Sequence, residues 1–183
     1  MASVIQRPTN RSKSEVSLSF FSFLFSEFVA ISNSVSSPDM HLEDHLHSVG
    51  VGVGERSLPL FHLRERPFRR ETSSTSCLQF IANSVWKQLF GKPAELQSTD
   101  QPGEFYLVDK GMILNRFISI SPEAAKESTM VNCAAFAAGI VEGMLRIAGF
   151  TTCKVDAVYT LAGSMDVVHE PQNVTFVVHL DKR

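Results

Sequence analysis

The sequence predicts an α+β fold in which helices pack against a mostly antiparallel four-stranded sheet. Two observations carry this prediction. Apolar residues recur with helical spacing through the first half of the 183 residues, and short runs rich in Val, Ile, Phe and Thr follow in the second half. One further helical pattern separates the first two extended runs from the last two. A chain of this length suggests one domain.

The first helical pattern, from Glu15 to about Asn33, is apolar over more than half of its circumference. Its apolar arc exceeds about 200° on a helical wheel, whereas a surface helix needs only about 100°. A monomer would therefore expose a large apolar patch. We predict that a partner subunit covers this helix, and that the partner interface contains these residues: Val16, Phe20, Phe21, Leu24, Phe25 and Phe28.

Residues 1–13 are polar and basic, and we expect them to form a flexible arm before a single domain over residues 14–183. Basic residues before an apolar run also occur in signal peptides, but Glu15 and Glu27 bracket this run and serines interrupt it. The run is also shorter than the ~20 apolar residues of a membrane span. Glu27 lies inside the apolar arc, where we expect it to be hydrogen-bonded at the edge of the interface.

A second helix and a further helical stretch are expected on either side of a glycine-rich segment. The capping residues at 37–39 predict a helix from Met40 toward Val49. Gly50–Gly54 should break or kink this helix. A separate helical stretch would follow over Glu55–Glu65, weakened in its first turn by Pro59.

The third helix is expected over Thr72–Phe90 because Leu and Ile recur there with helical spacing. Gly91 is suited to cap its C-terminus, and Pro93 prevents its continuation. The segment Gln97–Glu104 is predicted to be a loop.

Four extended runs supply the predicted sheet: Glu104–Val108, Met112–Ile120, Lys154–Thr160 and Val174–Leu180. Lys110-Gly111 is compatible with a tight hairpin between the first two. The clearest helix of the second half lies between the two pairs of strands, over Asn132–Ala148, with Asn132 as its cap and Gly149 as its stop. Small residues line one side of this helix: Ala135, Gly139 and Gly143. Tight packing in the core explains this side better than a ligand groove.

The composition excludes several classes of function. A net charge of −2 and a pI near 6.3 argue against a nucleic-acid binder. Three cysteines cannot form an even disulfide framework, which favours a reducing compartment. The sequence contains no phosphate-loop, dinucleotide, GxSxG or HExxH motif, so we expect no catalytic site and no cofactor.

Three features of the sequence are candidate sites. His41 and His45 lie one helical turn apart and could share a metal ion, but no third ligand is evident. Cys133 begins a helix, where a thiolate is favoured, although its apolar neighbours indicate a buried structural thiol. A basic cluster consists of Arg64, Arg66, Arg69 and Arg70. It could contact an anionic membrane or form surface ion pairs, and the sequence leaves both readings open.

Four segments, in order, resemble the trafficking protein particle (TRAPP) complex subunit 5 family. They are EVSLSFFSFLFSEFV, RRETSSTSCLQFIANSVWKQLFGKPAELQ, FYLVDKGMILNRFISI and STMVNCAAFAAGIVEGML. The resemblance extends from about Ser12 to Val158. It implies an α/β-plait, in which a twisted antiparallel sheet carries helices on one side.

The resemblance also implies a function. Family members pair through their first helices into heterodimers, within a complex that tethers vesicles between the endoplasmic reticulum and the Golgi and activates a Rab GTPase. Neighbouring subunits carry most of the nucleotide exchange. This chain is therefore expected to be a non-catalytic, cytoplasmic scaffold at those membranes. It would link the acylated subunit of the same fold to a longin-like subunit and would meet the Rab GTPase only indirectly.

The sequence departs from the family at two places. The related acylated subunit carries a cysteine where this chain has Arg66, so no thioester-linked acyl chain is expected there. The segment Leu161–Asn173 is longer than the family pattern and is assigned no partner surface. Two alternative functions remain: a small-molecule or acyl-chain binding module walled by the small-residue side of the fourth helix, and a metal-dependent enzyme built on His41 and His45.

Overall fold

A computed structural model describes residues 16–35, 40–64, 71–116, 131–150, 153–160 and 173–180. The N-terminal arm, residues 65–70 and residues 161–172 lie outside the described residues. The helices are α1 (Leu18–Val35), α2 (Leu42–Arg64), α3 (Ser74–Phe80), the π-helical turn η2 (Ile81–Val85), α4 (Trp86–Phe90) and α6 (Ala135–Ala148). The strands are β1 (Glu95–Ser98), β2 (Glu104–Asp109), β3 (Cys153–Thr160) and β4 (Asn173–Leu180).

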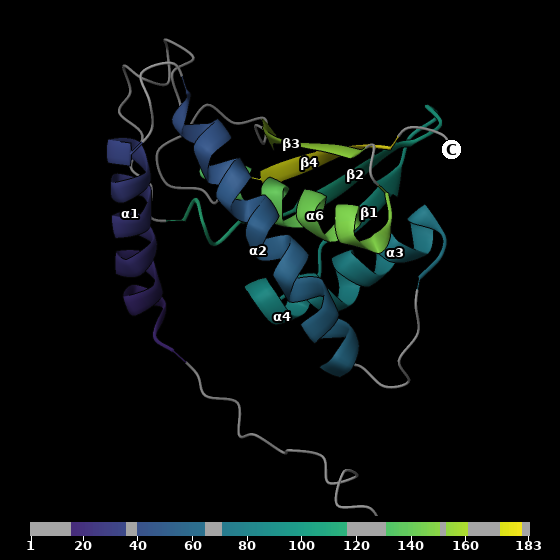
Figure 1. Ribbon diagram of the computed structural model, residues 1–183, viewed down its shortest axis with the longest axis horizontal. Coiled ribbons are helices and arrows are strands. Elements are labelled where there is room, and N and C mark those ends of the chain that lie inside the picture. The colour runs from purple at the N-terminus through teal and green to yellow at the C-terminus, as the bar shows by residue number, and fades with distance from the viewer. Residues whose placement is uncertain are drawn as a thin grey trace, which may run out of the picture.

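The strands form one antiparallel sheet in the order β1-β2-β4-β3. In Figure 1, α6 lies between this sheet and α2, while α1 stands at the left edge of the molecule. Alternate residues of the central strand β4 face the core, so Phe176 lies between Leu107 of β2 and Ala157 of β3 in the pairing register. The predicted α+β architecture, with helices against an antiparallel sheet, is confirmed.

The core lies between the inner face of the sheet and the helices. Trp86 packs edge-on against Phe176, with ring centroids 5.1 Å apart. The Trp86 indole donates a hydrogen bond of 2.9 Å to Asp109, which is 1% exposed. Lys92 forms an ion pair of 2.7 Å with the same carboxylate. The predicted third helix thus supplies both an apolar anchor and a partner for a buried charge.

The predicted break at Gly50–Gly54 is wrong, because α2 continues through this segment to Arg64. Gly50 and Gly54 face the backbone of α6, where a Cβ atom would overlap the carbonyl oxygens of Phe136 and Ile140. Each glycine lowers helix propensity by about 1 kcal/mol relative to alanine. The close approach of two helix backbones outweighs this cost, and Pro59 is accommodated inside the same helix.

The predicted first hairpin is also wrong. Met112–Arg116 forms turns, with the Asn115 amide donating to the Met112 carbonyl at 3.1 Å, and residues 117–120 lie outside the described residues. β2 pairs instead with β1 on one side and β4 on the other, and β1 lies within a segment partly expected to be a loop. β1 has four residues and one apolar side chain, that of Leu96, so its alternation of apolar and polar residues is too short to be recognised as a strand.

Helix ends agree closely with the sequence patterns. Gly91 adopts a left-handed conformation, with φ of 84°, and its amide donates to the Lys87 carbonyl at the end of α4. Gly149 ends α6 in the same way, with φ of 105°. Asn132 is not the predicted N-cap, because α6 begins at Ala135 with Ala134 as its N-cap; the Asn132 side chain instead accepts a hydrogen bond of 3.1 Å from the Ala134 amide in the preceding turn. The predicted stops of these two helices are confirmed.

Candidate functional site

The inward face of α1 attaches this helix to the body through aromatic contacts. Phe25 and Phe28 both reach Phe136 of α6, with ring centroids 6.1 Å and 5.4 Å apart. Phe21 stacks on Phe25 within α1 at 6.0 Å. These side chains follow the spacing of one helical face. Three of the six predicted interface residues are therefore placed against the chain's own core.

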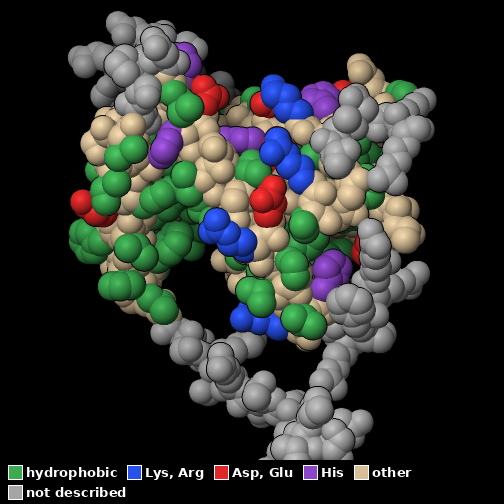
Figure 2. Space-filling view, viewed as in Figure 1, with side chains coloured by type: hydrophobic (Ala, Val, Ile, Leu, Met, Phe, Trp, Pro, Cys, Tyr) green, Lys and Arg blue, Asp and Glu red, His purple; other side chains and the backbone are tan. Residues whose placement is uncertain are grey.

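The outward face of α1 carries a second set of large apolar side chains that nothing in the described chain covers. Phe20 is 61% exposed and Phe23 is 76% exposed. We call this surface the outer stripe; it consists of Val16, just before α1, and of Phe20, Phe23, Leu24, Ile31 and Val35 within the helix. Figure 2 shows hydrophobic side chains gathered over α1 at the left of the molecule. The predicted interface residues Val16, Phe20 and Leu24 belong to it, whereas Phe23, Ile31 and Val35 were not among the predicted interface residues.

Among the described residues, α1 is the one helix long and apolar enough to cross a membrane, judged by length and composition. It lies near the N-terminus, and helices of soluble cores and signal sequences share this composition. Glu27 lies near its centre, where a carboxylate in a bilayer is unfavourable by about 3 kcal/mol. The inner face of α1 also packs on α6, through the contacts of Phe25 and Phe28 with Phe136. These features favour a surface helix of the folded domain.

An apolar cavity of about 290 Å³ lies between α1 and the rest of the domain. α1 contributes Phe21, Phe25 and Val29, while Leu114 and Cys133 line the opposite side. The Cys133 thiol is 3% exposed. Burial, followed by the charge of Glu43, raises its pKa to about 11. The thiol is thus protonated at neutral pH, in agreement with a buried structural cysteine.

The small-residue side of α6 is not an open groove, because α2 packs directly on it. A Cβ atom at Gly139 would overlap the carbonyl oxygen of His47, and one at Gly143 would overlap that of Val51. Tight packing in the core, the preferred interpretation of this side, is confirmed. The ligand wall considered for the acyl-chain alternative is therefore occupied by α2.

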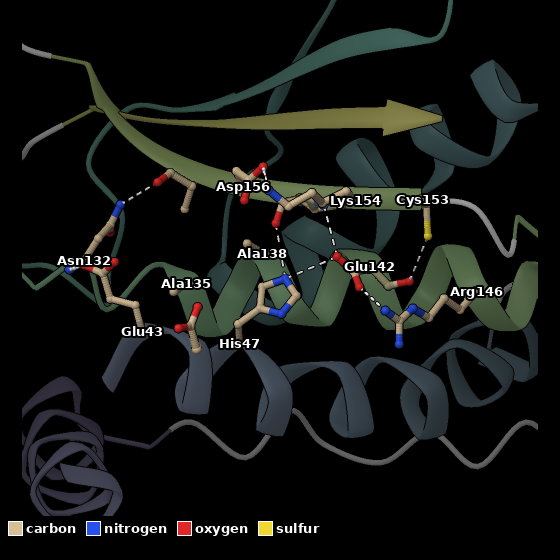
Figure 3. Close-up of a pocket in the computed structure, with 13 residues that line it drawn as sticks. Glu43, His47, Asn132, Ala135, Ala138, Glu142, Arg146, Cys153, Lys154 and Asp156 are labelled. Atoms are coloured by element: carbon tan, nitrogen blue, oxygen red, sulfur yellow. Dashed lines mark hydrogen bonds and ion pairs between the residues drawn. The ribbon is translucent and has the colours of Figure 1, made fainter. Parts of the chain in front are cut away.

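A polar cavity of about 440 Å³ lies where α2, α6 and β3 meet (Figure 3). At its centre is Glu142, which is 3% exposed. The Glu142 carboxylate pairs with Arg146, lies 3.3 Å from the His47 Nε2 atom, and accepts a hydrogen bond of 3.1 Å from the Val155 amide. His47 Nε2 also lies 3.2 Å from the Val155 carbonyl. Because both neighbours are acceptors, this nitrogen carries the proton.

Polar side chains that line this cavity cover the outer edge of the sheet, which is formed by β3. The Asn132 side chain donates a hydrogen bond of 2.9 Å to the Ala157 carbonyl of β3, and the Glu43 carboxylate accepts one of 2.6 Å from the backbone amide of Asn132. The side chains of Asn132, Glu142 and His47 thus bind the backbone of the edge strand β3, while Glu43 holds Asn132 in place. Such side-chain cover protects an edge from pairing with other chains. The sequence contained no motif that would have revealed this cluster, because its members come from three distant segments.

The other candidate residues of the sequence lie at the two ends of α2 or outside the described residues. His41 directly precedes α2, and its backbone carbonyl accepts the hydrogen bond of 3.2 Å from the His45 amide that closes the first turn, so the two residues lie one helical turn apart as expected. Among the described residues, no three His, Cys, Asp or Glu side chains come together to hold a metal ion. Arg64 is exposed at the end of α2, whereas Arg66, Arg69 and Arg70 lie outside the described residues.

Known proteins resemble this chain in both sequence and fold. The family described as transport protein particle (TRAPP) component matches residues 21–181. Trafficking protein particle complex subunit 5 of Dictyostelium discoideum is 40% identical over 80% of this chain and 78% of its own length. The human subunit 5 is 38% identical over 81% of this chain and 78% of its own length.

A more distant relative and a solved structure agree with this match. Subunit 31 of the Saccharomyces cerevisiae complex is 29% identical over 69% of this chain, which spans 44% of that protein. The crystal structure of a subunit 3 from Naegleria fowleri, covalently bound to palmitic acid, superposes with a TM-score of 0.65. The superposition covers 90% of this chain and 95% of the subunit 3 chain at 16% sequence identity, so it shows that the two chains share a fold.

Proposed function

Because this chain belongs to the TRAPP component family, among relatives named subunit 5, we propose that it is a non-catalytic scaffold subunit of the TRAPP complex. In this role it holds neighbouring small subunits in an assembly that tethers vesicles and promotes Rab nucleotide exchange between the endoplasmic reticulum and the Golgi. It acts in the cytoplasm, peripherally at those membranes. The exchange reaction itself belongs chiefly to other subunits.

The outer stripe is the observation that carries this proposal. Phe20 and Leu24 are each 61% exposed on a helix whose other face is already packed. From Phe20 to Val35 the stripe extends for about 22 Å along the helix axis. Contiguous exposed apolar surface of this kind marks a site of protein association. We assign it to a small TRAPP subunit of the same fold, the acylated one, and leave the longin-like subunit and the Rab GTPase to other surfaces of the assembly.

The polar residues in the core support a structural rather than a catalytic role. Glu142 is engaged by Arg146, His47 and a strand amide. Asp109 is engaged by Trp86 and Lys92. Each buried carboxylate thereby connects separate elements of the fold. Membrane contact is assigned to the basic cluster, of which Arg64 is exposed at the end of α2.

Reconstitution with a single partner tests the proposal. The full chain is co-expressed with the acylated same-fold TRAPP subunit of the same organism, and the mass of the purified product is measured by light scattering. We expect one complex with equal amounts of both chains. Recovery of both proteins only as separate species would contradict the scaffold role.

The apolar cavity beneath α1 supports a second candidate, binding of an acyl chain. Its volume of about 290 Å³ is at the lower end of the range for ligand pockets. The subunit 3 structure from Naegleria fowleri holds palmitic acid covalently, whereas we propose noncovalent binding in this cavity, because burial raises the pKa of the Cys133 thiol and so disfavours its nucleophilic thiolate. Native mass spectrometry of the purified chain tests this candidate: a stoichiometric fatty acid would support it, and a ligand-free mass after mild purification would contradict it.

A further inference from the structure

One charged residue, Glu27, lies among the apolar side chains of the outer stripe rather than at the edge expected from the sequence. Leu18–Val35 carries a single ionisable side chain, that of Glu27. On a helix with about 100° per residue, Phe20, Glu27 and Ile31 fall within about 40° of arc. Glu27 is exposed and has no hydrogen-bond or ion-pair partner among the described residues. An interface formed on the outer stripe must therefore cover this carboxylate.

A covered carboxylate needs a partner of its own. Removing an ionised group from water is strongly unfavourable unless an opposite charge or hydrogen-bond donors replace the water. Glu27 lies several residues from either end of α1, so the free amides of the helix N-terminus cannot reach it. The compensating group must come from the chain that covers the stripe.

A second copy of this chain is a poor occupant of the same surface. In a parallel pairing of two α1 helices, the two Glu27 side chains lie level with each other. In an antiparallel pairing centred on the stripe, they lie only about 5 Å apart along the helix axis. Both arrangements bring two carboxylates together in an apolar contact, where like charges repel strongly.

We propose that Glu27 determines which partner the outer stripe accepts: a different chain whose apolar surface places one Arg or Lys opposite Glu27. This inference rests on the proposed scaffold function and adds the chemistry of the partner surface. The apolar side chains of the stripe provide attraction without selectivity. Glu27 rejects self-association and selects the cationic partner, in the way that polar residues within apolar seams specify coiled-coil pairing.

Binding of Glu27 variants to the acylated same-fold TRAPP subunit tests the proposal. The dissociation constant is measured for full-length wild type, Glu27→Gln and Glu27→Lys by isothermal titration calorimetry. We expect Glu27→Lys to weaken binding at least about tenfold and Glu27→Gln to weaken it less. Glu55 is an exposed acid on α2, so Glu55→Lys is the matched control and should bind as wild type does.

Charge rescue identifies the opposing cation. Single Lys→Glu and Arg→Glu substitutions on the partner are tested against Glu27→Lys, and one of them should restore at least about tenfold of the lost affinity. Wild-type affinity of Glu27→Lys, or a complete panel without rescue, would overturn the proposal while leaving the scaffold function intact. Failure of the wild-type chain to bind the partner at all would instead contradict the scaffold function, and the proposal with it.

Self-association provides the second readout. Sedimentation analysis of the isolated chain should show Glu27→Leu associating with itself at least about tenfold more tightly than wild type. Equal self-association of the two proteins would overturn the role of Glu27 in rejecting a second copy. Flotation of the isolated chain with phosphatidylcholine vesicles tests lipid as the occupant. Binding that Leu24→Glu abolishes would overturn the proposal, because the stripe would then face a membrane.

Discussion

Phe28 of α1 lies edge-on to Phe136 of α6, with their ring centroids 5.4 Å apart. This contact and that of Phe25 with the same ring at 6.1 Å are the aromatic bridges between α1 and the body. Phe136 follows directly after the start of α6, next to the helix crossing formed by Gly50. The position of the outer stripe thus depends on one aromatic ring of another helix.

Replacing Phe136 by alanine should release α1 before it affects the rest of the domain. The substitution removes both ring contacts and leaves the inner face of α1 poorly packed, which is expected to reduce stability by about 2–3 kcal/mol. Hydrogen–deuterium exchange should show faster exchange over Leu18–Val35 than in wild type. Phe90→Ala is the control, because Phe90 packs on Trp86 instead. Unchanged α1 exchange in Phe136→Ala would contradict this attachment.

Glycines in α2 should differ sharply in their tolerance of a methyl group. Gly54→Ala inserts a Cβ atom against the Ile140 carbonyl and should lower the free energy of unfolding by about 2–3 kcal/mol. Gly52 lies in the same helix, and its nearest neighbour for a Cβ atom is the Arg56 side chain at 3.9 Å. Gly52→Ala should therefore raise stability by about 0.5–1 kcal/mol. Urea denaturation measures the free energy of unfolding of both variants. Equal changes in Gly54→Ala and Gly52→Ala would contradict the close crossing of α2 and α6.

The ion pair between Lys92 and Asp109 should contribute to stability through the buried carboxylate. Lys92→Met leaves the fully buried Asp109 with the Trp86 indole alone. Because the Lys92 side chain is 42% exposed, solvent screening reduces the expected loss to about 2 kcal/mol. Lys110→Met is the control, since Lys110 and Glu95 form an exposed pair, and its urea midpoint should match wild type. A urea midpoint of Lys92→Met equal to that of wild type would show that Lys92 does not stabilise the protein through the buried Asp109 carboxylate.

Stability should fall between pH 9 and pH 11 because two buried thiols resist ionisation. Burial, followed by the charge of Glu71, raises the pKa of Cys77 from 9.0 to about 11, and Cys133 is raised to about the same value. Thiols of the unfolded chain ionise first as the pH rises, so the stabilisation is complete below pH 9 and is lost by pH 11. Each thiol should account for a fall of about 2–3 kcal/mol in the free energy of unfolding across this pH range.

Urea denaturation across this range measures the effect. The raised pKa of Tyr159 adds to the fall at its upper end. Cys77→Ala and Cys133→Ala should each flatten the pH dependence relative to wild type. A free energy of unfolding that stays constant from pH 9 to pH 11 would show that these thiols titrate normally in the folded protein.

The sequence predicted those elements whose signals are local. Capping glycines such as Gly91 and Gly149 end helices through their own backbone conformation, so they were identified correctly. The fate of Gly50 and Gly54 depends on α6, more than eighty residues away, and a local rule could only count them as helix breakers. The short strand β1 was missed for the same reason, because its pairing with β2 rather than its composition makes it a strand.

The candidate site was predictable in part. Helical periodicity showed that α1 has more apolar surface than one contact requires, and the structure divides that surface into Phe21, Phe25 and Phe28 inside and the outer stripe outside. Which residues fall on each side depends on the position of Phe136. The polar residues around Glu142 could not be predicted to come together. In the sequence, the charged residues of α2 and α6 look like those of any helix surface, and only the fold places them beside β3.

Partner binding by a stripe variant tests the central claim most directly. Leu24→Glu places a second charge in the outer stripe, whereas Asn33→Glu places one on an exposed flank of the same helix and serves as its control. Calorimetric titration with the acylated same-fold TRAPP subunit should show that Leu24→Glu loses at least about a hundredfold in affinity, while Asn33→Glu binds as wild type does. Wild-type affinity of Leu24→Glu, with the fold intact, would show that the outer stripe is not the partner surface.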